Sequence, residues 1–428
     1  MNNQECIKHE KFCQFRREIR GSKEHLIVGI DIAKDKHYAF FGTSTGKTLF
    51  KRLIFHNNLE GYKKLLARVD ALKVQHCLSK VVFGLEPTGN YHKPLGAYLN
   101  GCDFMVVIVS GVAVKRNREL LDGRWDKHDT KCAANIADLI SQGKCLFYDS
   151  PSKEIIDLRN LLSLRKRLKK EEHSLRMRIR NNLLAKYFPE LDKFYGQCES
   201  ENLAIVRWCL DPKIIADMEF DQFFKMVTKR ERGIAQKKRL RAIWDSASDS
   251  VGCIPGESSE FEAGILVEKL RQVRQVIEKT EDLIKNVSMQ CPWYSLLLTI
   301  PGVGPYVASV ILAAIGNPYR FKNRKQVLKL AGYDLSANRS GKTSKDAVPV
   351  ISKKGNSNLR YALYQAALIA SVRNIHFLTC YTNTLRGRER EKGIKTKMRV
   401  RLAAKMLVIA WTMMKKKESF NPDCLSRK

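Results

Sequence analysis

The chain has 428 residues, with 77 Lys and Arg against 44 Asp and Glu, so its formal net charge at pH 7 is +33. A hydrophobic content of 44% excludes wholesale disorder, and the length allows two or three domains with ample cores. The strong positive charge indicates a nucleic-acid partner. Ribosomal and histone-like proteins share such a charge, but they are usually shorter.

The twelve cysteines are scattered and include no Cys-x-x-Cys pair, so we expect reduced thiols rather than structural zinc. The first residues lack the apolar stretch of a signal peptide. No uncharged apolar run reaches the length that spans a membrane. We therefore expect a soluble, cytoplasmic protein with no membrane partner.

Residues 1–24 are polar and charged and predict a flexible arm. Residues 25–150 alternate between β-branched apolar runs and amphipathic segments, which predicts an α/β domain. Three strands in a meander, followed by alternating helices and strands, are typical of an RNase H-like sheet. The expected strands are 26–32, 38–42, 48–56, 81–85 and 104–110, and the expected helices are 59–71, 91–99 and 127–142.

Residues 151–290 predict a coiled-coil arm with an inserted tip. Apolar residues recur at three- and four-residue steps over 153–187 and again over 260–287. This is the pattern of two long amphipathic helices, which we expect to pair in antiparallel fashion. The tip, within which 192–258 carries no motif that we can assign, has basic runs at 229–232 and 237–241. These runs suit either nucleic-acid binding or a plain solvated surface.

Residues 291–417 predict a mostly α-helical domain with a glycine-rich insertion, and 418–428 predict a tail. In this domain the segment 300–308 lies between two apolar helical segments and resembles a helix-hairpin-helix element. Gly302 and Gly304 would let backbone N–H groups approach a phosphate at the start of the second helix. The alternative is a tight turn between helices that binds nothing.

Four acidic residues in the first third of the chain form a candidate catalytic site. Asp31 and Glu86 each lie at or just after the end of an apolar run, where an α/β sheet collects catalytic side chains. Asp126 and Asp129 are three residues apart, so a helix would present both on one face. The alternatives are a turn acid for Asp31, a helix cap for Asp126 and a solvated acid for Asp129.

Carboxylates brought together repel one another, which raises some of their pKa values unless cations neutralise them. Hard oxygen ligands select Mg²⁺ or Mn²⁺. Carboxylates that bridge two such ions support phosphoryl transfer, with one ion at the nucleophile and one at the leaving oxygen. In so basic a chain the expected substrate is a nucleic-acid phosphodiester.

The glycine-rich insertion at 332–355 and the residues after it supply a second group of candidates. Ser340 could act as a nucleophile, with Lys342, Lys353, Lys354 and Arg360 as cations around its phosphate partner. By composition alone the nucleophile is weakly indicated, and a phosphate-binding loop or a plain flexible loop explains the pattern better.

The order and spacing of these segments resemble the DEDD transposases, the insertion-sequence-110 type recombinases that are related to the Piv DNA invertases. The resemblance extends over about residues 26–417. Each motif is modest by itself, whereas the ordered set is specific. The matching segments are 28–34, 86–91, 126–129 with 136–137, 301–304, and 340–341 with 351–356.

The resemblance implies a RuvC-like domain in which Asp31, Glu86, Asp126 and Asp129 are catalytic and hold Mg²⁺ or Mn²⁺. It implies a coiled coil used for assembly into a homo-oligomer, a dimer or a tetramer. It also implies a C-terminal transposase domain whose Ser340 attacks DNA and forms a covalent phosphoserine link. Members of the family are guided by a structured non-coding RNA that pairs with donor and target DNA.

Two other functions remain open at this stage. A Holliday-junction-type endonuclease would use the four acids without Ser340 and would leave no protein–DNA adduct. A catalytically decayed nucleic-acid-binding protein would retain only the charge. The intact set of acids favours an enzyme, and metal-dependent strand cleavage would distinguish the two classes.

Overall fold

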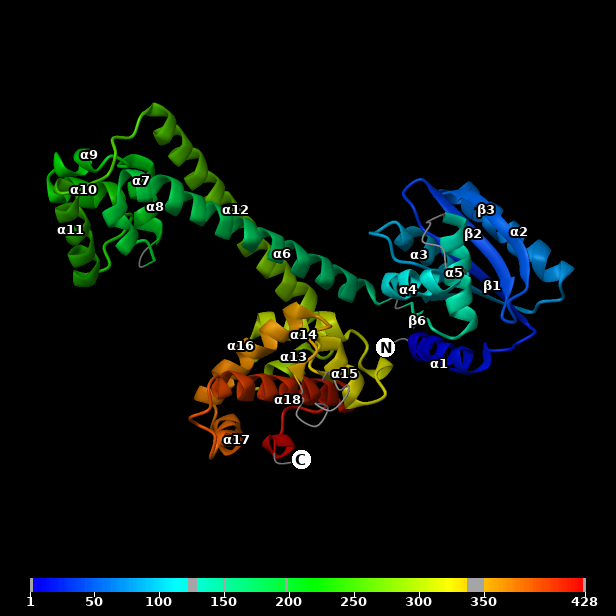
Figure 1. Cartoon of the computed structure of the whole chain (residues 1–428). Helices are drawn as coiled ribbons and strands as arrows, with labels where there is room; N and C mark the ends of the chain where they lie inside the picture. Colours follow the sequence, from blue (N-terminus) through cyan, green and yellow to red (C-terminus); the bar gives the residue numbers. More distant parts are fainter. Residues whose placement is uncertain (1–2, 122–128, 149–150, 197–198, 337–349, 426–428) are drawn as a thin grey trace, which may run out of the picture. The chain divides into compact units, whose positions relative to one another are not determined.

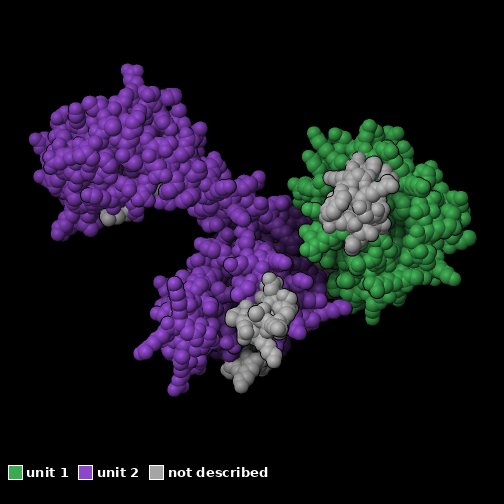
Figure 2. Space-filling view, in the orientation of Figure 1, with its two compact units in different colours: residues 1–151 green, residues 152–428 purple. Residues whose placement is uncertain are grey.

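The computed structural model describes residues 3–121, 129–148, 151–196, 199–336 and 350–425. The chain divides into two compact units, Met1–Pro151 and Ser152–Lys428 (Figures 1 and 2). No helix in the described part of the chain is long and apolar enough to cross a membrane. The first unit is a mixed α/β domain and the second is almost entirely helical, as expected from the sequence.

The described residues of unit 1 form one six-stranded sheet with the order β3-β2-β1-β4-β5-β6. The first three strands form an antiparallel meander, β4 and β5 continue parallel to β1, and β6 is antiparallel to β5. The strands are β1 (His25–Asp31), β2 (Lys36–Thr43), β3 (Thr48–His56), β4 (Lys80–Leu85), β5 (Met105–Ile108) and β6 (Leu146–Phe147). The helices are α1 (Asn3–Glu18), α2 (Leu59–Gln75), α3 (His92–Gly101), α4 (Gly111–Leu121) and α5 (Asp129–Ser141).

Different helices cover the two faces of this sheet, because successive residues of a strand point to opposite sides. On one face Val28 of β1 belongs to the same core as Leu65 of α2 and Leu99 of α3. On the other face Ile27 belongs to a core with Ile136 of α5. Both cores are fully buried, which explains why β1 is apolar along nearly its whole length.

Two paired glycines allow α5 to lie unusually close to the sheet. Gly29 of β1 and Gly84 of β4 are register partners, and both face α5. A Cβ on Gly29 would lie 2.2 Å from the backbone oxygen of Ala133 and 2.7 Å from the backbone nitrogen of Ala137. A Cβ on Gly84 would lie 2.0 Å from Cδ1 of Ile140. At Gly29 only hydrogen fits while α5 keeps its place, whereas at Gly84 a Cβ would force the side chain of Ile140 to move.

The N-terminal residues differ from the flexible arm that we expected, because 3–18 form α1. Phe12, Phe15 and Ile19 are buried in the core that contains α5. The Nε of Arg16 donates to the backbone oxygen of Gly143 over 3.1 Å. These three apolar residues recur at helical spacing among many charges, and this weak pattern was overlooked.

Unit 2 contains the antiparallel arm that the sequence predicted. Helices α6 (Lys153–Arg178) and α12 (Glu257–Met289) lie side by side (Figure 1). The expected single helix 153–187 is helical throughout but changes to a π-helical segment, η1 (Ile179–Leu184), before α7 (Ala185–Tyr187). Ion pairs join the two long helices: Arg165 with Glu281 at 2.6 Å, Arg274 with Glu172 at 3.1 Å, and Arg178 with Glu262 at 3.5 Å.

The two ends of the arm belong to separate hydrophobic cores. The start of α12 lies in the core of the tip, a small helical domain that fills the stretch without a recognisable motif. The end of α12 and the start of α6 lie in the core of the C-terminal helices. The tip elements are η2 (Pro189–Lys193), α8 (Glu199–Trp208), α9 (Pro212–Ala216), α10 (Phe220–Val227) and α11 (Ile234–Ser248).

The C-terminal part is a helical bundle with a short two-stranded sheet. The residues expected to form a tail are packed on it: Phe420 stacks on Phe377 with ring centroids 5.6 Å apart, and its backbone nitrogen donates to Oγ1 of Thr299 over 3.0 Å. The elements are α13 (Tyr294–Leu298), α14 (Pro305–Ile315), η3 (Pro318–Arg320), α15 (Arg324–Ala331), β7 (Leu335–Ser336), β8 (Val350–Ile351), α16 (Ser357–Arg373), α17 (Ile375–Leu385), α18 (Ile394–Lys416) and η5 (Pro422–Leu425).

The glycine pair yields a graded prediction. Gly29→Ala should destabilise unit 1 by about 1–3 kcal/mol, because its Cβ meets rigid helix backbone. Gly84→Ala should cost less, since Cδ1 of Ile140 can move away. Gly101→Ala, whose Cβ would have nothing within 4 Å, is the matched control and should be neutral or slightly stabilising. Hydrogen exchange of peptides from α5 in the full-length chain measures the effect, and equal exchange in all three variants would contradict the close packing.

Candidate active site

Asp31 and Glu86 lie at the carboxyl ends of two neighbouring parallel strands. Ile30 is the register partner of Leu85, so the next residue of each chain segment is one of the two acids. Asp31 lies two residues after Gly29, and Glu86 lies two residues after Gly84. Because residues two apart in a strand share a face, both acids lie on the sheet face that carries α5. Both side chains are half-buried. The structure thus brings together two of the four acids that the sequence singled out.

Both acids line one pocket of about 380 Å³. Its wall comes from the ends of β1 and β4, the start of β2, and the first turns of α4 and α5. Lys115 of α4 is a cationic member of this wall. The lining residues are Asp31, Ile32, Ala33, Tyr38, Glu86, Thr88, Gly111, Val114, Lys115 and Cys132.

Glu86 lies against the first residue of α4. A Cβ on Gly111 would be 2.8 Å from Oε1 of Glu86, so glycine leaves room for the carboxylate there. Ser110 caps the helix, since its Oγ accepts from the backbone nitrogen of Ala113 over 3.3 Å. A helix N-terminus carries partial positive charge, which favours an ionised carboxylate at this place. Helix α4 is not among the helices expected from the sequence, so this arrangement was not predicted.

The backbone that follows Asp31 is fixed by a buried histidine. The backbone nitrogen of Ala33 donates to Nδ1 of His37 over 3.3 Å. Burial lowers the pKa of His37, which keeps its ring neutral and able to accept this hydrogen bond. The turn after β1 is thereby held at the rim of the pocket.

The second pair of acids is only partly within the described chain. Asp129 is the first residue of α5, one helical turn before the pocket residue Cys132; Asp126 lies outside the described residues. The start of α5 therefore reaches the pocket that holds Asp31 and Glu86. Among the side chains that the structure describes, no group of three or more His, Cys, Asp or Glu could hold a metal ion.

A polar network that sequence reasoning missed joins α4 to α5. The Nδ2 of Asn117 donates to Oδ1 of Asn135 over 2.6 Å and to Oδ2 of Asp138 over 2.8 Å. The fully buried Asn135 in turn donates to the backbone oxygen of Val114 over 2.6 Å. This network fixes the two helices whose first turns form the pocket wall. The spacing of these residues in the sequence alone would not have revealed the network.

In the second unit, the two hairpin glycines have different surroundings. Gly302 has a φ of +83°, and a Cβ there would lie 2.4 Å from the backbone oxygen of Ala366 in α16. Glycine is therefore required at position 302 by both the packing and the backbone conformation. Gly304 is exposed, precedes α14 and would have nothing within 4 Å of a Cβ. The turn lies between α13 and α14, and both the helix-hairpin-helix element and phosphate binding by it stay predictions.

The glycine-rich insertion is closed at its base by two more packed glycines. A Cβ on Gly355 would lie 2.4 Å from the backbone nitrogen of Gly332. NH1 of Arg360 donates to the backbone oxygens of Ala331 at 2.8 Å and Gly355 at 3.3 Å. Arg360, which we predicted as a phosphate-binding cation, therefore has a structural task at this base.

Asp334 and Ser352 continue the base of the insertion into the short sheet of β7 and β8. The Oγ of Ser352 donates to Oδ1 of Asp334 over 2.6 Å, and their backbones pair over 2.7 Å. Lys353 and Lys354 are exposed at this base. Ser340 and Lys342 belong to 337–349, outside the described residues, between strands that pair directly. The roles predicted for Ser340 and for the three lysines, Lys342, Lys353 and Lys354, stay predictions.

Comparison with protein families gives two matches in the same order as the predicted domains. A family model of the IS110-type DEDD transposases, described as "Transposase", matches residues 28–189. A second model, "Transposase IS116/IS110/IS902 family", matches residues 294–382. The first match contains the pocket acids, and the second contains the hairpin glycines and the glycine-rich insertion. Together the two matches cover more than half of the chain.

Similar proteins extend over nearly the full length. The chain is 23% identical over 403 residues to "Insertion element IS110 uncharacterized 43.6 kDa protein" of Streptomyces coelicolor, covering 91% of this chain and 94% of that protein. It is 22% identical over 419 residues to "Transposase for insertion sequence element IS1111A" of Coxiella burnetii, covering 97% and 96%. The resemblance seen in the sequence is confirmed: the chain belongs to the IS110-type family of DEDD transposases.

Proposed function

We propose that this chain is the transposase of an insertion sequence and that the pocket at the ends of β1 and β4 is its metal-dependent DNA-cleaving site. One observation carries the proposal: Asp31 and Glu86 extend adjacent parallel strands on the same face and line one pocket with the first turns of α4 and α5. Such a position is where α/β sheets collect functional side chains. The sheet order supports a RuvC-like, RNase H-like fold for unit 1.

The donor set suits Mg²⁺ or Mn²⁺. Asp31 and Glu86 offer hard oxygen ligands, and Asp126 and Asp129 would add two more from the α5 side of the pocket. When bound, divalent ions would neutralise these carboxylates and activate a phosphodiester for displacement. Lys115, at the pocket wall, would attract the DNA backbone toward the acids.

Ser340 is the proposed nucleophile. Its Oγ would form a bond to the DNA phosphorus while the bond from phosphorus to the departing sugar oxygen breaks. A carboxylate of the acidic site would take the Ser340 proton, and the same proton would pass to the departing sugar oxygen. Lys342 would stabilise charge on the phosphate during the displacement. The reaction needs the acids and Ser340, of one or of two protomers, to meet during catalysis.

The remaining parts of the proposal rest on the family resemblance and on charge. A structured guide RNA would choose donor and target DNA by pairing with them. A dimer or tetramer of the protein would hold the DNA strands close together for rejoining. The net charge of +33 suits a protein that holds two kinds of polyanion.

Asp31→Asn tests the acidic site. The substitution removes a ligand charge and keeps the shape, so recombination should fall by more than the roughly 10–100-fold that loss of an outer-shell partner costs. Unfolding free energy should change by less than about 1 kcal/mol. Asp35→Asn is the matched control, because Asp35 is exposed four residues further along the same turn. Wild-type recombination by Asp31→Asn would exclude the pocket as the cleavage site.

Ser340→Ala tests the nucleophile. On a suicide DNA substrate the wild-type chain should form a covalent protein–DNA adduct, and Ser340→Ala should bind the same DNA without forming one. Ser336→Ala and Ser344→Ala serve as controls and should form the adduct normally. An adduct from Ser340→Ala would place the nucleophile elsewhere, and cleavage by the wild type with no adduct would favour the endonuclease.

A further inference from the structure

Positive charge is concentrated in one short stretch of the tip. Residues 225–241 contain eight Lys and Arg but a single acid, Glu231, whereas the preceding tip helices carry most of the acids. The stretch comprises the end of α10, the connecting loop 228–233, and the first half of α11. The eight cations are Lys225, Lys229, Arg230, Arg232, Lys237, Lys238, Arg239 and Arg241.

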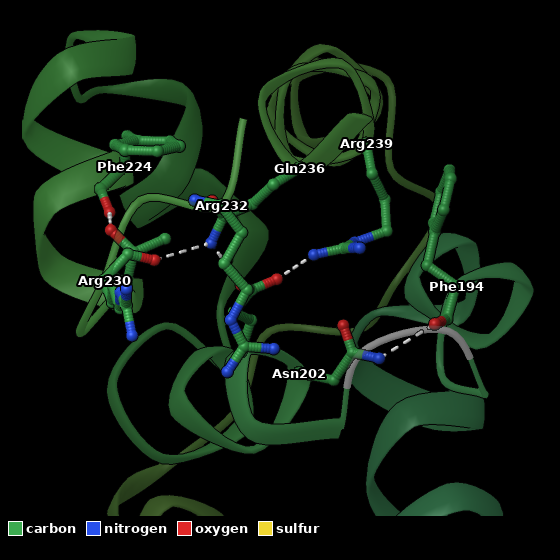
Figure 3. Close-up of polar contacts among 9 residues, drawn as sticks. Phe194, Asn202, Phe224, Arg230, Arg232, Gln236 and Arg239 are labelled. Atoms are coloured by element: carbon green, nitrogen blue, oxygen red, sulfur yellow. Dashed lines mark hydrogen bonds and ion pairs between the residues drawn. The ribbon is translucent and has the colours of Figure 1, made fainter. Parts of the chain in front are cut away.

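A buried glutamine holds this loop in one conformation. Oε1 of Gln236 accepts from the backbone nitrogen of Arg232 at 2.5 Å, and its Nε2 donates to the backbone oxygen of Arg230 at 3.1 Å (Figure 3). The same Nε2 donates to Oε1 of Glu201 at 2.6 Å. Gln236 is 5% exposed, so these bonds are protected from water. The backbone at Arg230 and Arg232 is therefore held in place in the absence of a ligand.

One of the eight cations is used inside the tip. Arg239 pairs with the buried carboxylate of Glu201, which neutralises it. Two others form exposed pairs: Lys237 with Glu231 at 2.9 Å and Arg241 with Asp245 at 3.6 Å. Exposed pairs of this kind contribute little and open readily.

The loop cations have no such partner. Lys229, Arg230 and Arg232 are exposed, and no carboxylate within the described parts of the chain lies in ion-pair distance of them. Residues 229–232 thus hold three cations and one acid, Glu231, which pairs with Lys237, so the loop keeps a net positive charge whose cations repel one another. An anionic ligand would relieve that repulsion.

The neighbouring aromatic rings indicate which polyanion fits. Phe220 packs on Phe224 at 5.9 Å and on Trp244 at 6.2 Å, and all three are half-buried. The guanidinium of Arg241 covers both Phe220 and Trp244 at 4.8 Å. Rings engaged in this way are poor platforms for unpaired bases, which single-stranded RNA and DNA recognition requires. Cations without stacking rings suit the backbone of a duplex.

We propose that the loop 229–232, together with the exposed cations of α11, binds the phosphate backbone of duplex DNA. This inference rests on the proposed function, because a transposase must hold its DNA substrates. It adds a DNA-contacting surface in the part of the chain that lies between the two family matches. Because its contacts are to phosphate, the surface adds affinity and orientation without reading sequence.

The test compares two triple variants of the full-length chain that change net charge equally. Lys229→Gln/Arg230→Gln/Arg232→Gln removes the loop cations, and Lys269→Gln/Lys279→Gln/Lys285→Gln removes three exposed lysines of α12. Binding of a fluorescent DNA duplex is measured by anisotropy over a range of salt concentrations. The loop variant should bind on the order of 100-fold more weakly at about 0.15 M salt, and its log–log salt slope should fall by about three. The α12 variant should bind like the wild type.

The other outcomes separate this inference from the proposed function. Equal weakening in both variants would show that diffuse charge binds DNA, and the tip surface would be refuted. If the loop variant loses binding to an RNA duplex of the same length but binds the DNA duplex as the wild type does, DNA is refuted as the ligand of this surface. If the wild type binds no duplex DNA, the proposed function fails with it. If the wild type binds and the loop variant binds equally, only the inference fails.

Discussion

The candidate site depends on how closely α5 lies against the sheet. Gly29 and Gly84 lie side by side on neighbouring strands and carry no side chain; the backbone of α5 lies over Gly29, and the side chains of Ile136 and Ile140 lie over Gly84. Two residues further along the same face, Asp31 and Glu86 open into the pocket where α4 and α5 begin. A side chain at Gly29 would push the helix backbone away from the sheet and carry its first turn away from the acids. Packing in the centre of the domain thus sets the geometry at its edge.

The strands of unit 1 and the long arm helices were predictable, because each is specified by its own apolar pattern. The ends of the five expected strands differ from the observed ends by no more than two residues, and the expected strand 48–56 has the same ends as β3. The α1 and α4 helices were missed for a common reason. Each buries a narrow stripe within a charged segment, Phe12 and Phe15 in one and Val114 in the other. So narrow a stripe is hard to recognise until the surface that covers it is known.

The glycines of the second unit show where sequence reasoning stops. A glycine that lets backbone approach a phosphate and a glycine that lets backbone approach a helix satisfy the same steric requirement. Gly302, Gly332 and Gly355 all meet protein backbone, and Arg360 binds carbonyl oxygens there. Gly302 packs on α16, whereas Gly332, Gly355 and Arg360 hold together the segments around 330–332 and 353–355. Within the described residues, glycines that suggest a phosphate-binding motif thus have structural contacts.

Net charge alone does not show where a polyanion binds, because some of the cations form ion pairs within the folded chain. Along the arm, Arg165 and Arg178 of α6 pair with acids of α12, so part of the positive charge of that helix holds the antiparallel pair together. In the tip, Glu201 takes one arginine and leaves the loop cations unpaired. The difference arises from the partner element: α12 is rich in Glu, whereas most acids of the tip precede the basic stretch 225–241 in the sequence. Segregation of opposite charges within a small domain, rather than a high total, is what creates a surface suited to DNA.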